Sequence, residues 1–252
     1  MAGLTALLLA GRRPGTDPLA ASRGVALKAL IPVAGRAMVA RVTDTLLACP
    51  EIERVRVLTQ DVDAITAALA PDPRVSVERS GDGIAASVAK IAREGRPLFV
   101  TTADHPLLTP ATVSAFLAAA GGVDVAVGVV ERGVVEARFP NTRRTWLRFK
   151  DGAWTGANLF RLQGWSALPV LTAWGQVEQD RKKGWRLIAR FGPALLVRAL
   201  TRTITLEMAV RRAGRRLGVT ARAIPLADPL AAVDVDKPED LALAEGVLGG
   251  RA

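Results

Sequence analysis

Short apolar runs alternate with amphipathic stretches through the first half of the chain. The runs have the length and continuity of buried parallel strands, and the stretches between them repeat their apolar positions with helical spacing. The predicted strands are Leu4–Ala10, Val55–Thr59, Val75–Val77 and Leu98–Thr102. The predicted helices are Met38–Ala48, Val62–Ala70 and Ile84–Arg93. This βαβα order predicts an α/β fold, in which helices cover both faces of a parallel sheet.

The pattern is less regular beyond Gly121. It predicts strands at Val123–Val130, Trp146–Lys150, Ala157–Leu162, Ala221–Leu226 and Ala232–Val235. It predicts helices at Ser166–Asp180, Trp185–Leu200, Leu206–Leu217 and from Pro238 onward, the second interrupted by Gly192-Pro193. No internal repeat or low-complexity linker divides the chain. We therefore expect a single domain over residues 1–252, with an inserted basic helical region at about 165–220.

The composition fits a globular protein in a reducing compartment. Half of the 252 residues are hydrophobic and 23% are charged. The one cysteine, Cys49, excludes an intrachain disulfide and a thiolate metal cluster, and its apolar surroundings indicate a packing role. The apolar N-terminal run stops at Gly11, and no run approaches the roughly 20 residues that span a bilayer. These features predict a soluble, cytoplasmic protein.

The net charge of +10 is concentrated in one segment. Residues 181–222 contain twelve Lys and Arg and a single acid, Glu207, whereas the remainder of the chain holds 22 bases and 23 acids. In Arg181–Phe191 the basic residues interleave with Trp, Leu, Ile and Phe. Such a stretch can lie on an anionic membrane surface, such as the inner membrane face, or can be an Arg-rich helical face in solvent. Nucleic acid is the less favoured partner, because no recognisable binding module is present.

Two loops that follow predicted strands carry candidate chemistry. Ligands of doubly wound sheets bind beyond the carboxyl ends of the strands. Gly11–Gly15 follows the first strand, and its glycines allow backbone N–H groups to approach a phosphate while Arg12 and Arg13 supply charge. Ala103-Asp104-His105-Pro106 follows the strand at 98–102. Each loop on its own is also compatible with an ordinary solvated turn.

The first loop, Leu9-Ala10-Gly11-Arg12-Arg13-Pro14-Gly15, is followed by Lys28-Ala29-Leu30-Ile31-Pro32-Val33-Ala34-Gly35. Together these resemble the signature of the NTP-transferase superfamily, which includes molybdenum-cofactor guanylyltransferase-like proteins, sugar-phosphate nucleotidyltransferases and cytidylyltransferases. The resemblance implies that Lys28 and one of Arg12 or Arg13 hold the triphosphate, with Arg13 favoured as the catalytic arginine. Arg12 stands where the superfamily usually has a second glycine. The resemblance implies a three-layer, Rossmann-like α/β/α fold with a mixed, mostly parallel sheet.

Two further motifs imply a metal site. Asp104, two residues before Pro106, matches the superfamily's metal-binding aspartate, and Asp236 matches the aspartate before its closing x-Pro-Glu-Asp-Leu motif, with Asp234 as the alternative. Mg²⁺ prefers carboxylate oxygens and takes few protein ligands beside substrate phosphates. The resemblance therefore implies Mg²⁺ as cofactor. Local capping of the helix from Pro238 is the alternative role for the acidic residues near Asp236.

The same resemblance assigns the remaining candidate residues. The stretch Ser80-Gly81-Asp82-Gly83-Ile84-Ala85-Ala86-Ser87 matches the loop that reads the nucleobase, although Asp82 is equally suited to capping a helix. The implied nucleotide-binding residues are Leu9, Ala10, Gly11, Arg12, Gly15, Ser80, Gly81, Gly83 and Ser87. The implied acceptor-binding residues are Gly156, Asn158 and Lys183, with a turn-fixing role equally open for Asn158. For His105, the single histidine, a positional or packing role is favoured over that of a general base.

The implied activity is transfer of a nucleoside monophosphate from an NTP to a phosphate-bearing acceptor, which is a sugar, alcohol or lipid-headgroup phosphate. Two alternatives stay open. An NDP-sugar-dependent glycosyltransferase of the same fold would require an Asp-x-Asp metal motif, which Asp104-His105-Pro106 does not supply. A non-catalytic, membrane-associated binding protein would release no pyrophosphate.

Overall fold

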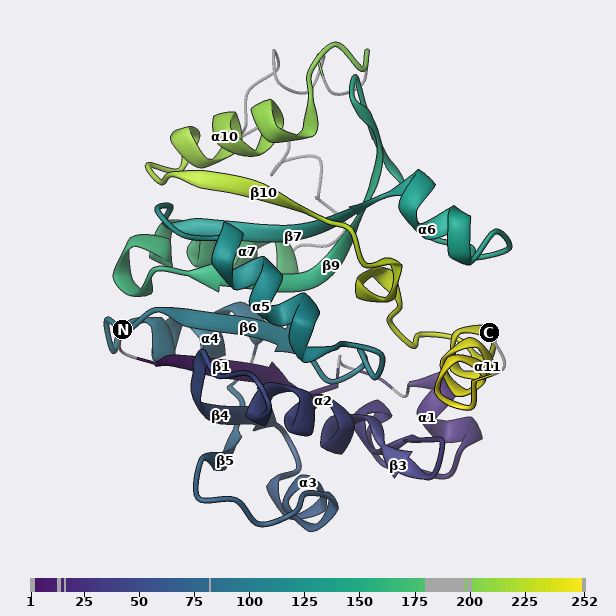
Figure 1. Cartoon of the computed structure of the whole chain (residues 1–252). Helices are drawn as coiled ribbons and strands as arrows, with labels where there is room; N and C mark the ends of the chain where they lie inside the picture. The colour runs from purple at the N-terminus through teal and green to yellow at the C-terminus, as the bar shows by residue number, and fades with distance from the viewer. Residues whose placement is uncertain are drawn as a thin grey trace. The chain divides into compact units, whose positions relative to one another are not determined.

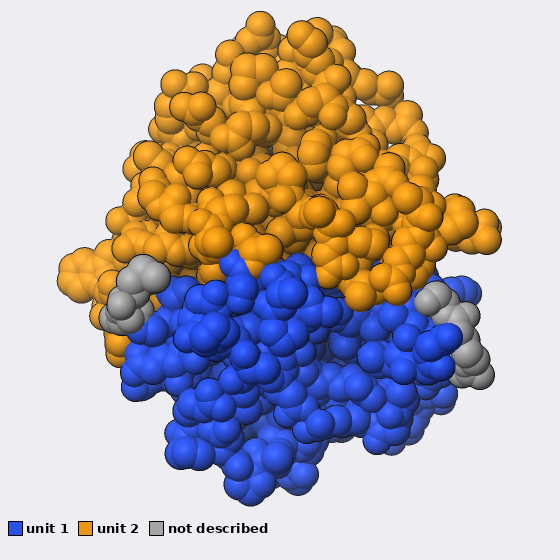
Figure 2. All heavy atoms as spheres, viewed as in Figure 1, with its two compact units in different colours: residues 1–81, 99–114, 233–252 blue, residues 82–98, 115–232 orange. Residues whose placement is uncertain are grey.

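The computed structural model describes residues 3–12, 15, 17–81, 83–179, 198 and 201–250. The chain divides into two compact units, which Figure 2 colours separately. The first comprises Met1–Gly81, Phe99–Ser114 and Val233–Ala252, and the second comprises Asp82–Leu98 and Ala115–Ala232. The single domain with a basic insertion stays a prediction.

The first unit is built on four strands in the order β6-β1-β4-β5. These are β1 (Leu4–Leu9), β4 (Ile52–Thr59), β5 (Val75–Arg79) and β6 (Leu98–Thr102). β1 pairs in parallel with β4, and β4 pairs in parallel with β5. Ala6, Leu7 and Leu8 are consecutive and all fully buried, so β1 is covered on both faces. This is the environment that its uninterrupted apolar run predicts.

Helices and a small hairpin surround these strands (Figure 1). They are α1 (Pro18–Ser22), the 3-10 turn η1 (Lys28–Leu30), β2 (Pro32–Val33), β3 (Arg36–Ala37), α2 (Met38–Leu47), α3 (Val62–Ala68), α5 (Pro110–Ala119) and α11 (Pro238–Leu248). α2 buries Met38, Val42 and Leu46 at helical spacing, as its amphipathic pattern predicts. Aspartates accept hydrogen bonds at two helix starts: Asp17 from Ala20 in α1, and Asp61 from Ala64 in α3.

The second unit contains a mixed set of strands in the order β10-β7-β9, with β8 also paired to β9. β10 (Ala221–Leu226) runs parallel to β7 (Val125–Glu131), while β9 (Gly152–Leu162) runs antiparallel to β7 and to β8 (Leu147–Phe149). The helical elements are α4 (Ile84–Ala92), α6 (Arg132–Arg138), η2 (Gly164–Ala167), α7 (Leu168–Gln179), α10 (Leu206–Arg216) and η4 (Pro229–Ala232). α10 lies along β10 (Figure 1).

The fold class is the expected one, a mixed and mostly parallel sheet flanked by helices. One predicted strand is wrong. The segment 232–235 forms no strand, because η4 occupies its start and Val233–Asp236 is irregular. The alternation that suggested a strand comes from burial of Val233 and Val235 between the less buried Asp234 and Asp236.

Cys49 behaves as a packing residue. Its side chain is buried, and burial together with the nearby Glu51 carboxylate raises the pKa of the Cys49 thiol to about 11. The thiol is therefore protonated at neutral pH and is a poor nucleophile. Among the described residues, no helix combines the length and apolar character needed to cross a bilayer.

Asp124 ties together the starts of β7 and β10. Its Oδ2 accepts hydrogen bonds from the hydroxyl of Thr220 at 2.6 Å and from the Thr220 amide at 2.8 Å, while its own N–H donates to Thr220 Oγ1 at 2.9 Å. The Thr220 hydroxyl and then the Thr220 amide hold the pKa of Asp124 below its ordinary value. A depressed folded-state pKa means that the carboxylate stabilises the fold above pH 4 or so, and that this contribution is lost as the pH falls through the folded-state pKa.

We expect Asp124→Ala to lower the free energy of unfolding at pH 7 by about 1–2 kcal/mol, because two donors of Thr220 lose their acceptor at a partly solvated site. Urea unfolding of wild type and variant at pH 7 and at about pH 2.5 checks this. The difference between the two proteins should shrink at the lower pH. An equal difference at both pH values would show that the carboxylate charge has no part in it.

Candidate active site

Lys28 lies between two carboxylates. Its Nζ is 2.5 Å from Asp104 Oδ2 and 2.5 Å from Asp236 Oδ1. The side chains of Lys28 and Asp104 are 21% and 18% exposed, and that of Asp236 is 59% exposed. The cluster is thus open to solvent on the Asp236 side. All three residues belong to the first unit, so the structure brings together the predicted phosphate-binding lysine and both predicted metal ligands.

Backbone hydrogen bonds fix Asp104 at the carboxyl end of β6. The Ala103 amide donates to Leu9 O at 3.0 Å, and the Asp104 carbonyl accepts from the Val235 amide at 2.8 Å. The second bond ties the segment that carries Asp236 to the loop that carries Asp104. Asp104 does not cap α5, since Thr109 Oγ1 accepts from the Thr112 amide at the start of that helix.

Asp236 immediately precedes α11, and its carboxylate is not used to cap that helix. Asp240 Oδ2 accepts hydrogen bonds from the Asp236 amide at 3.1 Å and from the Lys237 amide at 3.0 Å. Asp240 therefore does the capping that the alternative interpretation assigned to this acidic motif. The Asp236 carboxylate is left to face Lys28.

The two sides of the ion pair stabilise each other's charged forms. Burial by itself lowers the pKa of Lys28, but the attraction of Asp104 and Asp236 outweighs burial and raises it above its ordinary value. For Asp104 the effect of burial is the opposite, because burial raises the pKa of a carboxyl group. The nearby Lys28 ammonium outweighs burial and holds the pKa of Asp104 below its ordinary value. Lys28 and Asp104 are therefore both charged at neutral pH.

The residues present fit a divalent cation. Asp104 Oδ1 is buried and has no hydrogen-bond partner among the described residues, so one hard oxygen of the pair is uncommitted. No group of three or more ligating side chains occurs within the described ranges. A set of two carboxylates suits Mg²⁺, which is usually held by one or two carboxylates together with substrate phosphates.

The side chain of Gln60 forms hydrogen bonds with the start of the glycine loop after β1. Gln60 Oε1 accepts a hydrogen bond from the Arg12 amide at 2.8 Å, and Gln60 Nε2 donates to the Arg12 carbonyl at 3.2 Å. The Arg12 N–H therefore already has an acceptor, and the exposed guanidinium is the group that Arg12 could offer to a phosphate. Leu9 is the last residue of β1, and the next residue, Ala10, is buried and donates its amide to Leu58 O of β4.

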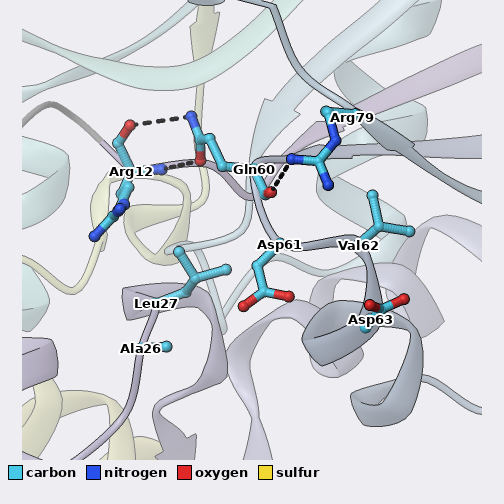
Figure 3. A pocket seen from close by; sticks show the side chains of 8 residues that line it. All are labelled: Arg12, Ala26, Leu27, Gln60, Asp61, Val62, Asp63 and Arg79. Carbon is cyan, nitrogen blue, oxygen red and sulfur yellow. Dashed lines mark hydrogen bonds between the residues drawn. The ribbon is translucent and has the colours of Figure 1, made fainter.

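A cavity of about 350 Å³ adjoins this loop within the first unit. It is lined by Arg12, Ala26, Leu27, Gln60, Asp61, Val62, Asp63 and Arg79 (Figure 3). Leu27, one of the lining residues, is the chain neighbour of Lys28. Gln60 and Arg79 are not predicted from the sequence, although Gln60 follows β4 and Arg79 ends β5, at the edge where ligands of such sheets bind.

The residues predicted to read the nucleobase are divided between the units. Ser80 and Gly81 follow β5 and belong to the first unit. The Ser80 amide donates to Thr59 O at 2.7 Å. Gly83 and Ser87 belong to the second unit, where the Ser87 hydroxyl donates to the Gly83 carbonyl. The Glu178 carboxylate accepts from the Ile84 and Ala85 amides, so it satisfies the first N–H groups of α4. Asp82, which the sequence suggested as the capping residue, lies outside the described residues.

The predicted acceptor residues that are described belong to the second unit. Asn158 has φ of 53° at an irregularity in the β7–β9 pairing, a backbone conformation that Asn tolerates better than most residues. Gly156 is exposed and has open space around its Cα.

Arg13, Lys183 and most of the basic stretch 181–200 lie outside the described residues. Gly15 adopts φ of 103°, which favours glycine there. His105 is buried, as a packing role requires.

Comparison with known proteins identifies the family of the chain. Residues 8–204 match the family described as the MobA-like NTP transferase domain. A Thermus thermophilus structure described as a hypothetical transferase has 31% sequence identity and a TM-score of 0.82, covering 95% of this chain and 99% of its own. No curated protein matches the sequence.

Two solved structures with lower identity share the fold. CMP:2-keto-3-deoxy-manno-octonic acid synthetase, in complex with CTP, has 14% identity and a TM-score of 0.60, covering 99% of this chain and 100% of its own. The 2-C-methyl-D-erythritol 4-phosphate cytidylyltransferase of Thermus thermophilus has 15% identity and a TM-score of 0.55, covering 97% of this chain and 98% of its own. With a family match over most of its length, and with Lys28 placed between Asp104 after β6 and Asp236 ahead of α11, the chain belongs to the family of MobA-like NTP transferase domains.

Proposed function

We propose that the protein is a Mg²⁺-dependent nucleotidyltransferase that moves a nucleoside monophosphate from an NTP to a phosphate-bearing acceptor. The observation that carries this proposal is the position of Lys28 Nζ, 2.5 Å from both Asp104 and Asp236. A lysine beside two carboxylates supplies a cation for phosphate oxygens and oxygens for a metal ion in one place. The family assignment supports the same chemistry.

The reaction is an in-line displacement at the α-phosphorus. An oxygen of the acceptor phosphate forms a bond to the α-phosphorus, the bond from that phosphorus to the α,β-bridging oxygen breaks, and pyrophosphate leaves with the electron pair. The acceptor phosphate is already an anion at neutral pH, so no general base is needed. Bound Mg²⁺ would neutralise charge on the triphosphate and orient the leaving group.

The residues of the chain act by position and charge. Asp104 and Asp236 would hold the metal ion, and Lys28 would place its ammonium against the phosphate oxygens that gain charge as pyrophosphate departs. The guanidinium of Arg12 or Arg13, from the glycine loop, would add a second cation. The acceptor would be held by Gly156, Asn158 and Lys183, and the nucleobase by the Ser80–Ser87 stretch.

Pyrophosphate release from a panel of substrates tests the proposal. Each of the four NTPs is incubated with Mg²⁺ and with sugar phosphates, alcohol phosphates or lipid-headgroup phosphates, and pyrophosphate is measured by a coupled assay. CTP is the first nucleotide to test, because two structures of the same fold are a CMP-sugar synthetase and a cytidylyltransferase by description. Release that depends on one NTP and one acceptor is the expected result. If no combination yields pyrophosphate, the transferase proposal fails, and NDP-sugars become the next donors to examine.

We further propose that the basic region contacts an anionic membrane surface. In α10, Arg211, Arg215 and Arg216 are exposed, as is Arg222 in β10, and none forms an ion pair within the described part of the chain. Glu207, the one acid of this segment, is directed elsewhere, since it accepts from the Ala223 amide. Each basic residue near an anionic surface adds roughly 1 kcal/mol of attraction. Such a contact would give a cytoplasmic protein a peripheral location at the inner face of the membrane.

Vesicle sedimentation provides the measurement. We expect the protein to sediment with phosphatidylglycerol vesicles at low salt, to stay in solution with phosphatidylcholine vesicles, and to be released at high salt. Arg211→Glu/Arg215→Glu should weaken binding by at least tenfold, because two attractive charges become repulsive. Equal binding of wild type and variant would leave α10 as a solvated helical face.

A further inference from the structure

Gln60 and Arg12 form a two-bond contact between the end of β4 and the start of the glycine loop. The Gln60 side-chain amide accepts from the Arg12 N–H at 2.8 Å and donates to the Arg12 carbonyl at 3.2 Å (Figure 3). Both bonds involve the backbone of Arg12, so they hold the backbone at that position whatever side chain stands there. An amide is the side-chain group that can donate and accept in this way.

Gly11 leaves the room that this contact needs. A Cβ added at Gly11 would lie 2.9 Å from both Nε2 and Oε1 of Gln60, closer than real Cβ contacts. The φ of Gly11 is outside the left-handed region, so the backbone itself would accept alanine there. The glycine is therefore explained by the approach of the Gln60 amide rather than by backbone conformation.

Gln60 is itself held by the sheet edge. Its carbonyl accepts from Arg79 Nη1 at 2.9 Å, and the preceding Thr59 is fully buried at the end of β4. Beyond the loop, Asp17 accepts from the Ala20 amide at the start of α1.

We infer that Gln60 is a positioning residue that holds Gly11 and Arg12, the start of the glycine loop, in place for the triphosphate. This inference rests on the proposed function for the role of the loop, whereas the contact itself can be tested without any substrate. Ordering a backbone residue costs conformational entropy, so a loop start that is held in place before binding spares the nucleotide this cost. Loss of the contact reduces the fraction of protein with a competent loop, and apparent NTP affinity falls by the same factor.

Limited trypsin digestion reads the loop directly. The bond after Arg12 is the cleavable one, because the bond after Arg13 precedes Pro14 and resists trypsin. We expect Gln60→Ala to increase the rate of cleavage after Arg12 by about tenfold, the effect of losing two hydrogen bonds when opening is in equilibrium. Cleavage at the wild-type rate would overturn the inference.

A double-variant cycle separates the contact from other effects. Gly11→Ala should increase cleavage about as much as Gln60→Ala, because its methyl group displaces the Gln60 amide. In the Gln60→Ala background the same methyl group has room, so Gly11→Ala/Gln60→Ala should be cleaved no faster than Gln60→Ala alone. Additive increases in the double variant would show that the two residues act independently and would overturn the inference.

Asp61→Ala serves as the matched control. Asp61 is adjacent to Gln60 and accepts from the Ala64 amide at the start of α3, so its loss lowers the melting temperature without touching Arg12. Cleavage after Arg12 should stay at the wild-type rate in this variant. Faster cleavage here would attribute the Gln60 result to general destabilisation.

The kinetic consequence is a rise in the KM for NTP with a much smaller change in kcat in Gln60→Ala. A fall in kcat at unchanged KM would contradict a positioning role. If wild-type protein released no pyrophosphate from any NTP, the proposed function would fail, while the proteolysis cycle would still decide whether Gln60 holds the loop.

Discussion

Asp104→Asn is expected to reduce pyrophosphate release by at least about 10³-fold while leaving the fold intact. The variant removes the charge of a carboxylate that is proposed to hold the metal ion, and metal-assisted charge stabilisation is worth several kcal/mol at the transition state. Asparagine has the same shape, and its Oδ1 can still accept from Lys28, which sits 2.5 Å from the wild-type carboxylate. Steady-state pyrophosphate release and a thermal melt of both proteins provide the measurement. Near-normal turnover would remove Asp104 from the metal site.

Asp236 and Asp234 offer an internal comparison for the second ligand. Asp236 Oδ1 lies 2.5 Å from Lys28 Nζ, which places Asp236 in the cluster, and Asp234 is the alternative ligand two residues earlier. Asp236→Asn should therefore lose activity on the scale of Asp104→Asn, and Asp234→Asn should lose far less. The reverse order would make Asp234 the ligand and would show that the Lys28–Asp236 pair belongs to the unliganded protein alone.

The strands that the sequence predicts correctly are those whose environment matches their pattern. β1 and β6 are continuous apolar runs, and their residues are buried on both faces. The predicted strand at 232–235 is wrong because alternating apolar and polar residues show only which side chains are buried, not whether the backbone pairs with another strand. The Val235 amide donates one backbone hydrogen bond to the Asp104 carbonyl, and no ladder of strand pairing forms there. α6 was not predicted, since its Arg132–Arg138 sequence has little apolar periodicity and depends on Glu131, which accepts from the Gly133 amide.

The site shows a similar division. Lys28 and Asp236 are 208 residues apart, and only a family resemblance could predict that they meet. Gln60 could have been found without it, because a polar residue at the end of a central parallel strand lies where ligands bind. Nothing in the sequence shows that its amide forms hydrogen bonds with the backbone of Arg12, because that contact depends on the register of β4 against β1. Local pattern specifies elements, and register specifies contacts.

The last prediction concerns Lys28, which competes with the metal ion for the same two carboxylates. In the unliganded protein the ammonium lies 2.5 Å from both Asp104 and Asp236, so a Mg²⁺ ion that binds both carboxylates has to compete with it. Lys28→Met keeps most of the length of the unbranched side chain and removes the charge. Without Mg²⁺ the variant should be less stable by about 1–2 kcal/mol, a value reduced by partial solvent exposure, because two carboxylates then face each other unpaired.

Addition of Mg²⁺ should offset this loss of stability. The metal ion meets no competing ammonium in Lys28→Met, so it should bind more tightly and raise the melting temperature more than it does in wild type; a tenfold gain in affinity adds about 1.4 kcal/mol at saturation. Catalysis should nevertheless fall by about 10²–10³-fold, because the cation that opposes charge on departing pyrophosphate is lost. Thermal melts over a Mg²⁺ titration, paired with pyrophosphate assays, measure both effects. A metal-dependent shift no larger than that of wild type would show that Lys28 and Mg²⁺ do not share these carboxylates, and would place the metal elsewhere.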